Sequence, residues 1–300
     1  MKNNRLGKSE LEVSEIGLGC MSLPNDLEVA KSIIDEAFDH GIRFFDTADF
    51  YGKGENEQLV GAALKARRQD VILATKVGNE WQADSDEVSW NATKEYITEQ
   101  VHNSLHRLGT DYIDLYQLHG GMITDDTEET IDAFETLKKE GLIRAYGISS
   151  IRPNVIRRFL DQADLASIMM QYSLLDRRPE EFLGQIEDAG VSVITRGSLA
   201  QGLLTNSGLS RAETKGNYMS YEKEQLAKTI SDLTDVHGDL HALALHSVLH
   251  NPAVASAITG ASSQTQLQDT LRAYHEQIPE ETIQDAFQQV KQENYTQHRE

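Results

Sequence analysis

The chain has 300 residues, with 28 Lys and Arg against 48 Asp and Glu, and a formal net charge of −20. This excess of negative charge disfavours non-specific binding to nucleic acids or to anionic membranes. The single cysteine, Cys20, excludes an intramolecular disulfide. The first residues hold no apolar stretch of signal-peptide length, and no run of about 18 apolar residues occurs anywhere. We therefore expect a cytoplasmic protein with no membrane or nucleic-acid partner.

Short apolar runs of strand length recur along the chain, each rich in Val, Ile, Leu or aromatic residues. They occupy residues 14–19, 42–47, 71–76, 112–119, 143–149, 167–173, 191–197 and 254–260. Amphipathic stretches typical of helices lie between them, for example residues 27–41, which end at Gly41. Thr127 is a candidate N-cap of a later helix, and Pro153 suits the first turn of another.

This alternation of strands and helices indicates parallel β/α units. Eight such units in 300 residues predict an α/β protein with a (β/α)₈ TIM-barrel fold, formed as a single domain over residues 1–300. An open doubly wound sheet is the alternative, but no G-x-G-x-x-G follows a strand. Residues 1–13 read as a β-hairpin that closes the floor of the barrel, and residues 197–221 read as a long loop after the seventh strand.

Polar side chains gather where the predicted strands end. The segment "FFDTADFYG", residues 44–52, places Asp46, Asp49 and Tyr51 after the second strand. Lys76 ends the third strand and His119 the fourth. Active sites of barrels lie at the carboxyl ends of the strands, so we expect these side chains to meet at one rim although they are far apart in sequence.

The residue types at this rim point to proton transfer. A lysine at the end of a buried strand needs a counter-charge, which Asp46 on the adjacent strand can supply. A cation beside Tyr51 favours the phenolate and should lower the pKa of the phenol toward neutrality. His119 could share the hydrogen bond and orient a substrate oxygen. The cluster therefore suits protonation of a carbonyl oxygen while a hydride reaches the carbon, and it requires no metal.

The segments "FFDTADFYG", "ILATKVG", "DYIDLYQLHG" and "IRAYGISS" resemble the signature segments of the aldo-keto reductase superfamily. The similarity is greatest to its bacterial members, with kinship to the potassium-channel beta subunits. The resemblance implies a (β/α)₈ barrel that uses NADPH to reduce aldehydes or ketones, with a small-molecule carbonyl compound as its partner. It also implies a catalytic tetrad that falls on Asp46, Tyr51, Lys76 and His119.

The resemblance further implies a set of cofactor-binding positions. Gly19, Cys20 and Met21 match a turn beside the nicotinamide, to which Asp46 also belongs. Ser149 and Ser150 replace a Ser-Asn pair that holds the carboxamide. The family glutamine falls on Met169, so that Gln171, two residues on, would have to substitute for it, and Arg196 replaces an aromatic that stacks on the ring. The remaining expected positions lie in the segments after strands seven and eight: Gly197, Ser198, Leu199, Ala200, Gly202, Leu203, Gly260, Ser262, Ser263 and Gln264.

The chain departs from the family most clearly where the adenosine 2′-phosphate would be held. From Thr259 to Leu271 there is no basic residue, and Arg272 lies one turn too far along. Neutral hydrogen bonds are weaker than charge-assisted ones. We therefore expect NADPH to be used with a smaller advantage than usual, so that NADH could also be accepted, unless a side chain such as Lys215 reaches in from the long loop.

Two other functions are compatible with the sequence. A reductase-like barrel could bind NADP(H) and report redox state to a partner, with weak reductase activity. A metal-dependent hydrolase could use Asp46, Asp49 and His119, although a lysine and a tyrosine in the same cluster disfavour it. The histidine pairs 102/106 and 246/250 have helical i, i+4 spacing, but no third ligand is evident, and no metal site is expected.

Overall fold

Eight parallel strands close into a barrel in the order β10-β11-β12-β3-β4-β5-β8-β9 in the computed structural model, which describes residues 1–82 and 85–300. The predicted (β/α)₈ fold is therefore confirmed, and each predicted apolar run overlaps one barrel strand. The strands are β3 (Ile16–Gly19), β4 (Phe44–Asp46), β5 (Ile72–Val77), β8 (Ile113–Leu118), β9 (Ile143–Ser149), β10 (Ser167–Gln171), β11 (Ser192–Arg196) and β12 (Val254–Gly260).

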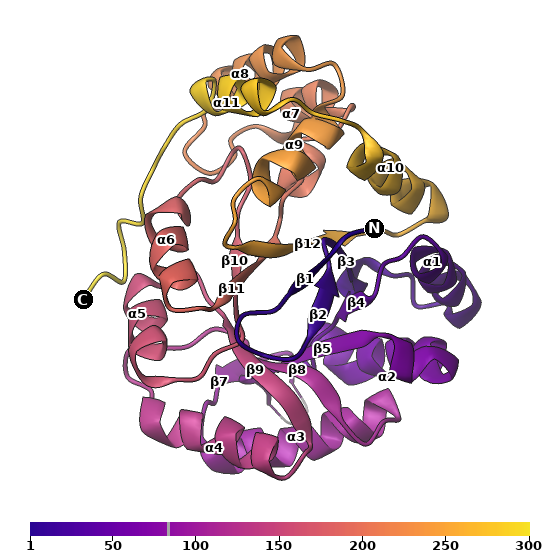
Figure 1. Ribbon diagram of the computed structural model, residues 1–300, viewed down its shortest axis with the longest axis vertical. Coiled ribbons are helices and arrows are strands. Elements are labelled where there is room, and N and C mark those ends of the chain that lie inside the picture. The colour runs from indigo at the N-terminus through magenta and orange to yellow at the C-terminus, as the bar shows by residue number, and fades with distance from the viewer. Residues whose placement is uncertain (83–84) are drawn as a thin grey trace.

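Helices surround the barrel on its outside (Figure 1). They are α1 (Leu27–Asp39), α2 (Glu55–Leu64), α3 (Lys94–Leu108), α4 (Thr127–Lys139), α5 (Pro153–Gln162), α6 (Glu180–Asp188), α7 (Gly208–Lys215), α8 (Lys223–Val236), α9 (Leu240–Leu249), α10 (Gln264–His275) and α11 (Glu280–Gln288). Pro153 occupies the first turn of α5 as predicted. The N-cap of α4 is Asp126 rather than Thr127, because the Asp126 carboxylate accepts the Glu129 amide hydrogen at 3.0 Å.

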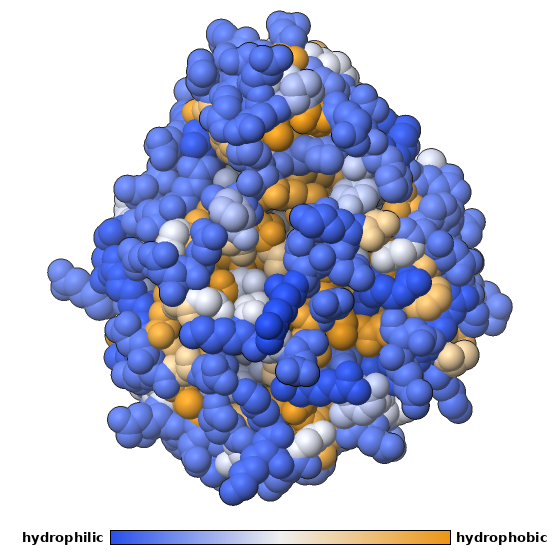
Figure 2. All heavy atoms as spheres, in the orientation of Figure 1, coloured by the Kyte–Doolittle hydropathy of each residue, from blue (hydrophilic) through white to orange (hydrophobic). Residues whose placement is uncertain are grey.

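A hairpin covers one end of the barrel. It consists of β1 (Asn3–Arg5) and β2 (Glu12–Ser14), which pair antiparallel. Leu6, Leu11 and Val13 are buried against side chains from the barrel interior, among them Phe44 and Leu115. The hairpin lies over the barrel opening in Figure 1, and the same face in Figure 2 is mostly hydrophilic, with apolar atoms visible between the elements around it. The predicted floor of the barrel is thus present.

Regular structure also forms in two segments outside the barrel strands, and the first of them, residues 197–221, reads as a loop in the sequence. Residues 197–221 include a 3₁₀ turn, Ala200–Gly202, and the helix α7, because apolar side chains of this segment, such as Leu203 and Ala212, are buried in a cluster with α8 and α9. After β5, a small hairpin forms from β6 (Asn79–Trp81) and β7 (Val88–Trp90). None of the helices in the described part of the chain is both long enough and apolar enough to cross a membrane.

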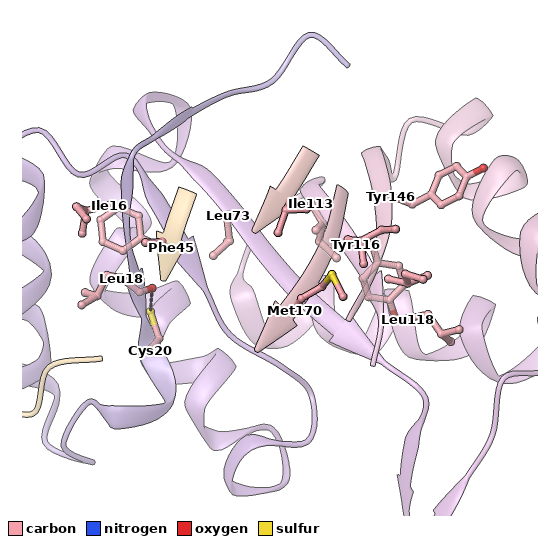
Figure 3. Packing of buried hydrophobic residues seen from close by; sticks show 14 of the residues in the cluster. Ile16, Leu18, Cys20, Phe45, Leu73, Ile113, Tyr116, Leu118, Tyr146 and Met170 are labelled. Carbon is pink, nitrogen blue, oxygen red and sulfur yellow. Dashed lines mark hydrogen bonds between the residues drawn. The ribbon is translucent and has the colours of Figure 1, made fainter. Parts of the chain in front are cut away.

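The main core lies between the strands and the surrounding helices. Ile16, Leu18 and Phe45 are fully buried there, and Figure 3 shows them beside Cys20. The Cys20 thiol donates a hydrogen bond to the Leu18 carbonyl at 3.6 Å. Burial, reinforced by the nearby Asp46 charge, raises the pKa of this thiol well above its usual range. Cys20 is therefore a packing residue rather than a reactive one.

Two helical glycines allow the packing between helices to be tested. A Cβ on Gly61 in α2 would lie 2.3 Å from the Leu108 carbonyl oxygen at the end of α3, whereas a Cβ on Gly184 in α6 would meet nothing within 4 Å. We expect Gly61→Ala to lower the free energy of unfolding by about 1–3 kcal/mol through overpacking. Gly184→Ala should raise it by about 0.5–1 kcal/mol, since alanine is the better helix former. Urea denaturation measures both, and equal effects would contradict the close contact between α2 and α3.

Candidate active site

The carboxyl ends of the barrel strands surround a cavity of about 910 Å³. Asp46, Tyr51, Lys76 and His119, which come from the ends of three adjacent strands, all line it. Eight of the other expected positions also line it: Gly19, Met21, Ser149, Ser150, Gln171, Arg196, Gly197 and Gly260. The topology of the parallel barrel thus brings together residues that are up to 241 positions apart in sequence.

The centre of this site is a buried ion pair. The Lys76 ammonium is 2.6 Å from Asp46 Oδ2 and donates a second hydrogen bond to the Thr47 carbonyl at 2.7 Å. Gln117 on β8 donates to the other Asp46 oxygen at 3.3 Å. Burial opposes the charge on Lys76, but the Asp46 and Tyr51 groups outweigh it and raise the lysine pKa. Lys76 is therefore held as a cation.

Tyr51 and His119 lie beside this pair. Lys76 Nζ is 5.2 Å from the centre of the Tyr51 ring, and the Tyr51 and His119 rings lie 5.9 Å apart at 87°. Burial raises the pKa of the Tyr51 phenol above its usual value, although Lys76 opposes this shift. The sequence-based expectation of a lowered pKa is therefore wrong in sign, because it considered the cation without the cost of burying a phenolate.

His119 is a neutral imidazole at physiological pH. Burial, together with the charges of Lys76 and Arg196, lowers its pKa to about 3. Its Nδ1 atom is buried without a hydrogen-bond partner among the described residues. A neutral imidazole has one donor and one acceptor nitrogen, so His119 can either donate to or accept from a group in the cavity.

The turn after β4 positions Tyr51. The Tyr51 amide donates to the Ala48 carbonyl at 3.2 Å, and the following 3₁₀ turn reverses the chain through Gly52 and Gly54, whose φ angles are +57° and +91°. L-residues with side chains rarely adopt such angles. Phe50, which also lines the cavity, stacks on Trp81 of β6 with ring centres 4.8 Å apart. Local backbone geometry and this stack together hold the phenol at the rim.

The cavity wall offers groups that fit a nicotinamide cofactor. Serine hydroxyls and a guanidinium provide hydrogen-bond donors, and glycines leave backbone exposed to a flat ring. At Gly260 an added Cβ would lie 2.4 Å from Ser22 Oγ, so a side chain there would displace the Ser22 hydroxyl. Gln171 lies two residues from Met169 on the same face, but its amide already binds Arg196 at 3.0 Å and Asp176 at 2.9 Å.

The other expected cofactor positions lie outside this lining. Cys20, Ser198, Ala200 and Leu203 are buried, with 0–1% of their surfaces exposed. Ser263 caps α10 by accepting the Gln266 amide hydrogen. Leu199, Gly202, Ser262 and Gln264 also fall outside the wall of the cavity.

Several wall residues were missed by sequence reasoning. They are Phe50, Asn79, Arg152, Arg178, Tyr218 and the C-terminal residues Tyr295, Thr296, Gln297 and His298. Phe50 stands inside the "FFDTADFYG" segment, so its place at a strand end was a usable signal. The C-terminal residues carry no such signal, since only tertiary contacts bring them to the rim.

Comparison with known proteins gives consistent results. A model of the "Aldo/keto reductase family" matches residues 15–289. The chain is 49% identical to the uncharacterized oxidoreductase YqkF of Bacillus subtilis over the full length of both chains. It is 31% identical to the NADH-specific methylglyoxal reductase of Escherichia coli, covering 91% of this chain and 93% of that one. It superposes on the holo form of the aldo-keto reductase AKR11C1 from Bacillus halodurans with a TM-score of 0.95, 50% identity and full coverage of both chains.

Asp49 lies two residues before Tyr51 in the segment after β4 and has an unusual environment. It is buried, and its Oδ1 atom has no hydrogen-bond partner among the described residues. Burial and the nearby Glu57 carboxylate raise the pKa of Asp49 to about 8. Glu57 itself accepts hydrogen bonds from Arg107 and Thr75, both at 2.6 Å. Asp49 is therefore protonated at neutral pH.

This proton makes stability depend on pH. An unfolded aspartate has a pKa of about 3.9, so between about pH 4 and pH 8 the folded state holds a proton that the unfolded state has released. The free energy of unfolding must then fall as pH rises through this window. Between pH 5.5 and 8.5, we expect the free energy of unfolding to fall by about 2–4 kcal/mol more in wild type than in Asp49→Asn. Asp188→Asn, an exposed change of the same kind, should follow wild type in urea titrations. If the free energy of unfolding changed with pH in the same way in all three proteins, the conclusion that Asp49 is protonated would be contradicted.

Proposed function

Because the chain belongs to the aldo/keto reductase family, whose members are oxidoreductases acting on carbonyl compounds with nicotinamide cofactors, we propose that it reduces an aldehyde or ketone to an alcohol with Tyr51 as the general acid. The observation that carries this proposal is the placement of Tyr51 and neutral His119 beside the Lys76–Asp46 ion pair in one cavity. The family supplies the reaction class, and the cavity supplies the residues.

The proposed reaction adds one hydride and one proton to the carbonyl group. The reduced nicotinamide, when bound, supplies the hydride to the carbonyl carbon. Ser149, Ser150 and Arg196 are the wall residues suited to hold it. The Tyr51 hydroxyl donates the proton to the carbonyl oxygen, and the Lys76 ammonium stabilises the phenolate that remains.

The electrostatics of the site suit Tyr51 to act as a proton donor at neutral pH. A phenol whose pKa is raised by burial is fully protonated at neutral pH and ready to donate. A neutral His119 can donate a hydrogen bond to the same carbonyl oxygen without placing a second cation beside Lys76. Asp46 keeps Lys76 in place and charged.

Removal of the Tyr51 hydroxyl tests the general acid. We expect Tyr51→Phe to reduce kcat for NADPH-dependent reduction of aldehydes by about 10²–10⁴-fold, while fluorescence titration shows unchanged NADPH binding. Tyr112→Phe is the control, because Tyr112 packs under Arg68 and Arg144 outside this cavity. Near-normal turnover of Tyr51→Phe, with hydride transfer limiting the rate, would refute the assignment.

Polar side chains on the helix after β12 are engaged with other residues, which supports only a modest preference for NADPH over NADH. Arg272 forms an ion pair with Asp239, and Gln268 donates to Glu36 at 2.6 Å, so both are engaged. Lys215 on α7 donates to Gln201 Oε1 at 2.5 Å, and Gln201 lines the cavity. Lys215 is therefore the cation we propose for contact with the 2′-phosphate, and both NADPH and NADH should be accepted.

Dissociation constants at matched ionic strength test this preference. We expect NADPH to bind more tightly than NADH by less than about a thousandfold, or roughly 4 kcal/mol. Lys215→Ala should weaken NADPH and leave NADH nearly unchanged, whereas Lys228→Ala on α8, paired with Asp232, should affect neither. A larger preference that survives Lys215→Ala would require a different basic contact.

A further inference from the structure

The wall of the cavity is basic although the chain is strongly acidic. Arg152, Arg178 and Arg196 all line it, in a protein of net charge −20. They follow or end β9, β10 and β11, which are neighbours in the barrel. We call these three residues the guanidinium arc, because they occupy one continuous part of the rim, next to the strands that carry the tetrad.

A contact ion pair neutralises one of the three members of this arc, Arg178. Asp46 is the sole carboxylate in the described lining, and it is paired with Lys76 at 2.6 Å. Arg178 binds Asp176 through two bonds of 2.7 Å. Within residues 1–82 and 85–300, neither Arg152 nor Arg196 has a carboxylate oxygen within 4.0 Å. Two positive charges therefore face the cavity without a contact counter-ion, which favours an anionic ligand.

The C-terminal segment covers the same arc. In Figure 1 it runs from α11 past α6 toward α5. The Asn154 amide donates to the His298 carbonyl at 2.8 Å, and the Arg178 guanidinium lies 5.0 Å from the centre of the Tyr295 ring. The Tyr295 hydroxyl is buried without a partner among the described residues. The C-terminal residues 295–298 thus line the same cavity as the arc, and the three arginines are half-buried there, where charges interact more strongly than in bulk water.

Arg152 is the member of the arc closest to the tetrad histidine along the wall. Its Nη1 atom donates to the Gly121 carbonyl, and Gly121 lies two residues after His119. Two residues span at most about 7 Å. An anion bound by Arg152 would therefore share the cavity with a carbonyl group held at Tyr51 and His119.

We propose that Arg152 anchors an anion subsite, and that the substrate is an aldehyde or ketone with a carboxylate or phosphate a few bonds from its carbonyl group. This inference rests on the proposed reductase function. The phosphates of the cofactor are expected after β11 and β12, whereas Arg152 follows β9, which borders β8. The Arg152 charge is thus left for the substrate.

Paired substrates measure the contribution of the anion. The probes are 4-oxobutanoate with its methyl ester, and glyceraldehyde 3-phosphate with glyceraldehyde, each reduced with NADPH at fixed ionic strength. We expect wild type to favour at least one anionic probe by roughly tenfold or more in kcat/KM. Arg152→Gln should lower kcat/KM for that probe by roughly 10–100-fold and change its neutral partner by less than about threefold. Comparison of the carboxylate pair with the phosphate pair shows which anion the subsite binds.

Two further variants separate charge from structure. Arg152→Lys should restore part of the anionic preference, because it keeps the charge but loses the planar donor fork. Arg158→Gln, an equal charge change on α5, should behave as wild type, since Arg158 binds the Ile123 carbonyl and lies outside the cavity lining. NADPH dissociation constants should be unchanged in all three variants.

The results that would overturn the anion subsite differ from the result that would overturn the reductase function. Reduction of the neutral probes without an anionic preference overturns the subsite alone, as do equal losses for both members of a pair in Arg152→Gln. Weakened NADPH binding in Arg152→Gln would assign the residue to the cofactor and likewise overturn the subsite. No reduction of any carbonyl compound by wild type would overturn the reductase function, and the subsite with it.

Discussion

The buried ion pair between Lys76 and Asp46 is the constraint on which the rest of the site depends. An ammonium group that is 1% exposed is costly unless a counter-charge accompanies it. The barrel supplies that charge from the adjacent strand, and Gln117 from the strand on the other side of β5 supports it. Three neighbouring strands thereby contribute to one small polar cluster at the rim of the barrel.

The same pair determines what its neighbours can do. Lys76 stabilises negative charge on Tyr51, yet burial keeps the phenol protonated until a reaction removes its proton. Lys76 and burial also keep His119 neutral. One cation in a poorly solvated site therefore leaves a protonated phenol and a neutral imidazole side by side, which is the division of roles that the proposed carbonyl reduction requires.

Two kinds of structural element form the wall of the cavity: barrel strands on one side, and loops with the C-terminal segment on the other. The tetrad residues stand on β4, β5 and β8 and in the turn after β4, where the backbone is held by the barrel hydrogen bonds. The guanidinium arc and the C-terminal segment form the other side, where loops and the end of the chain meet. The proposed reaction chemistry thus lies on the rigid barrel, and the proposed anion subsite lies on the loops beside it.

The sequence by itself determined the barrel and the meeting of the tetrad. Alternating apolar runs and amphipathic stretches leave few other ways to bury eight short strands, and parallel strands must end at the same rim. It did not determine α7, whose Ala212 is buried in a cluster with Leu203 and with side chains of α8 and α9. The sign of the Tyr51 shift depends on burial, and the place of His298 and Arg152 on the cavity wall depends on contacts across the fold. Periodicity records local preference, whereas burial and long-range contact exist only once the chain has closed on itself, so only the tertiary structure could decide them.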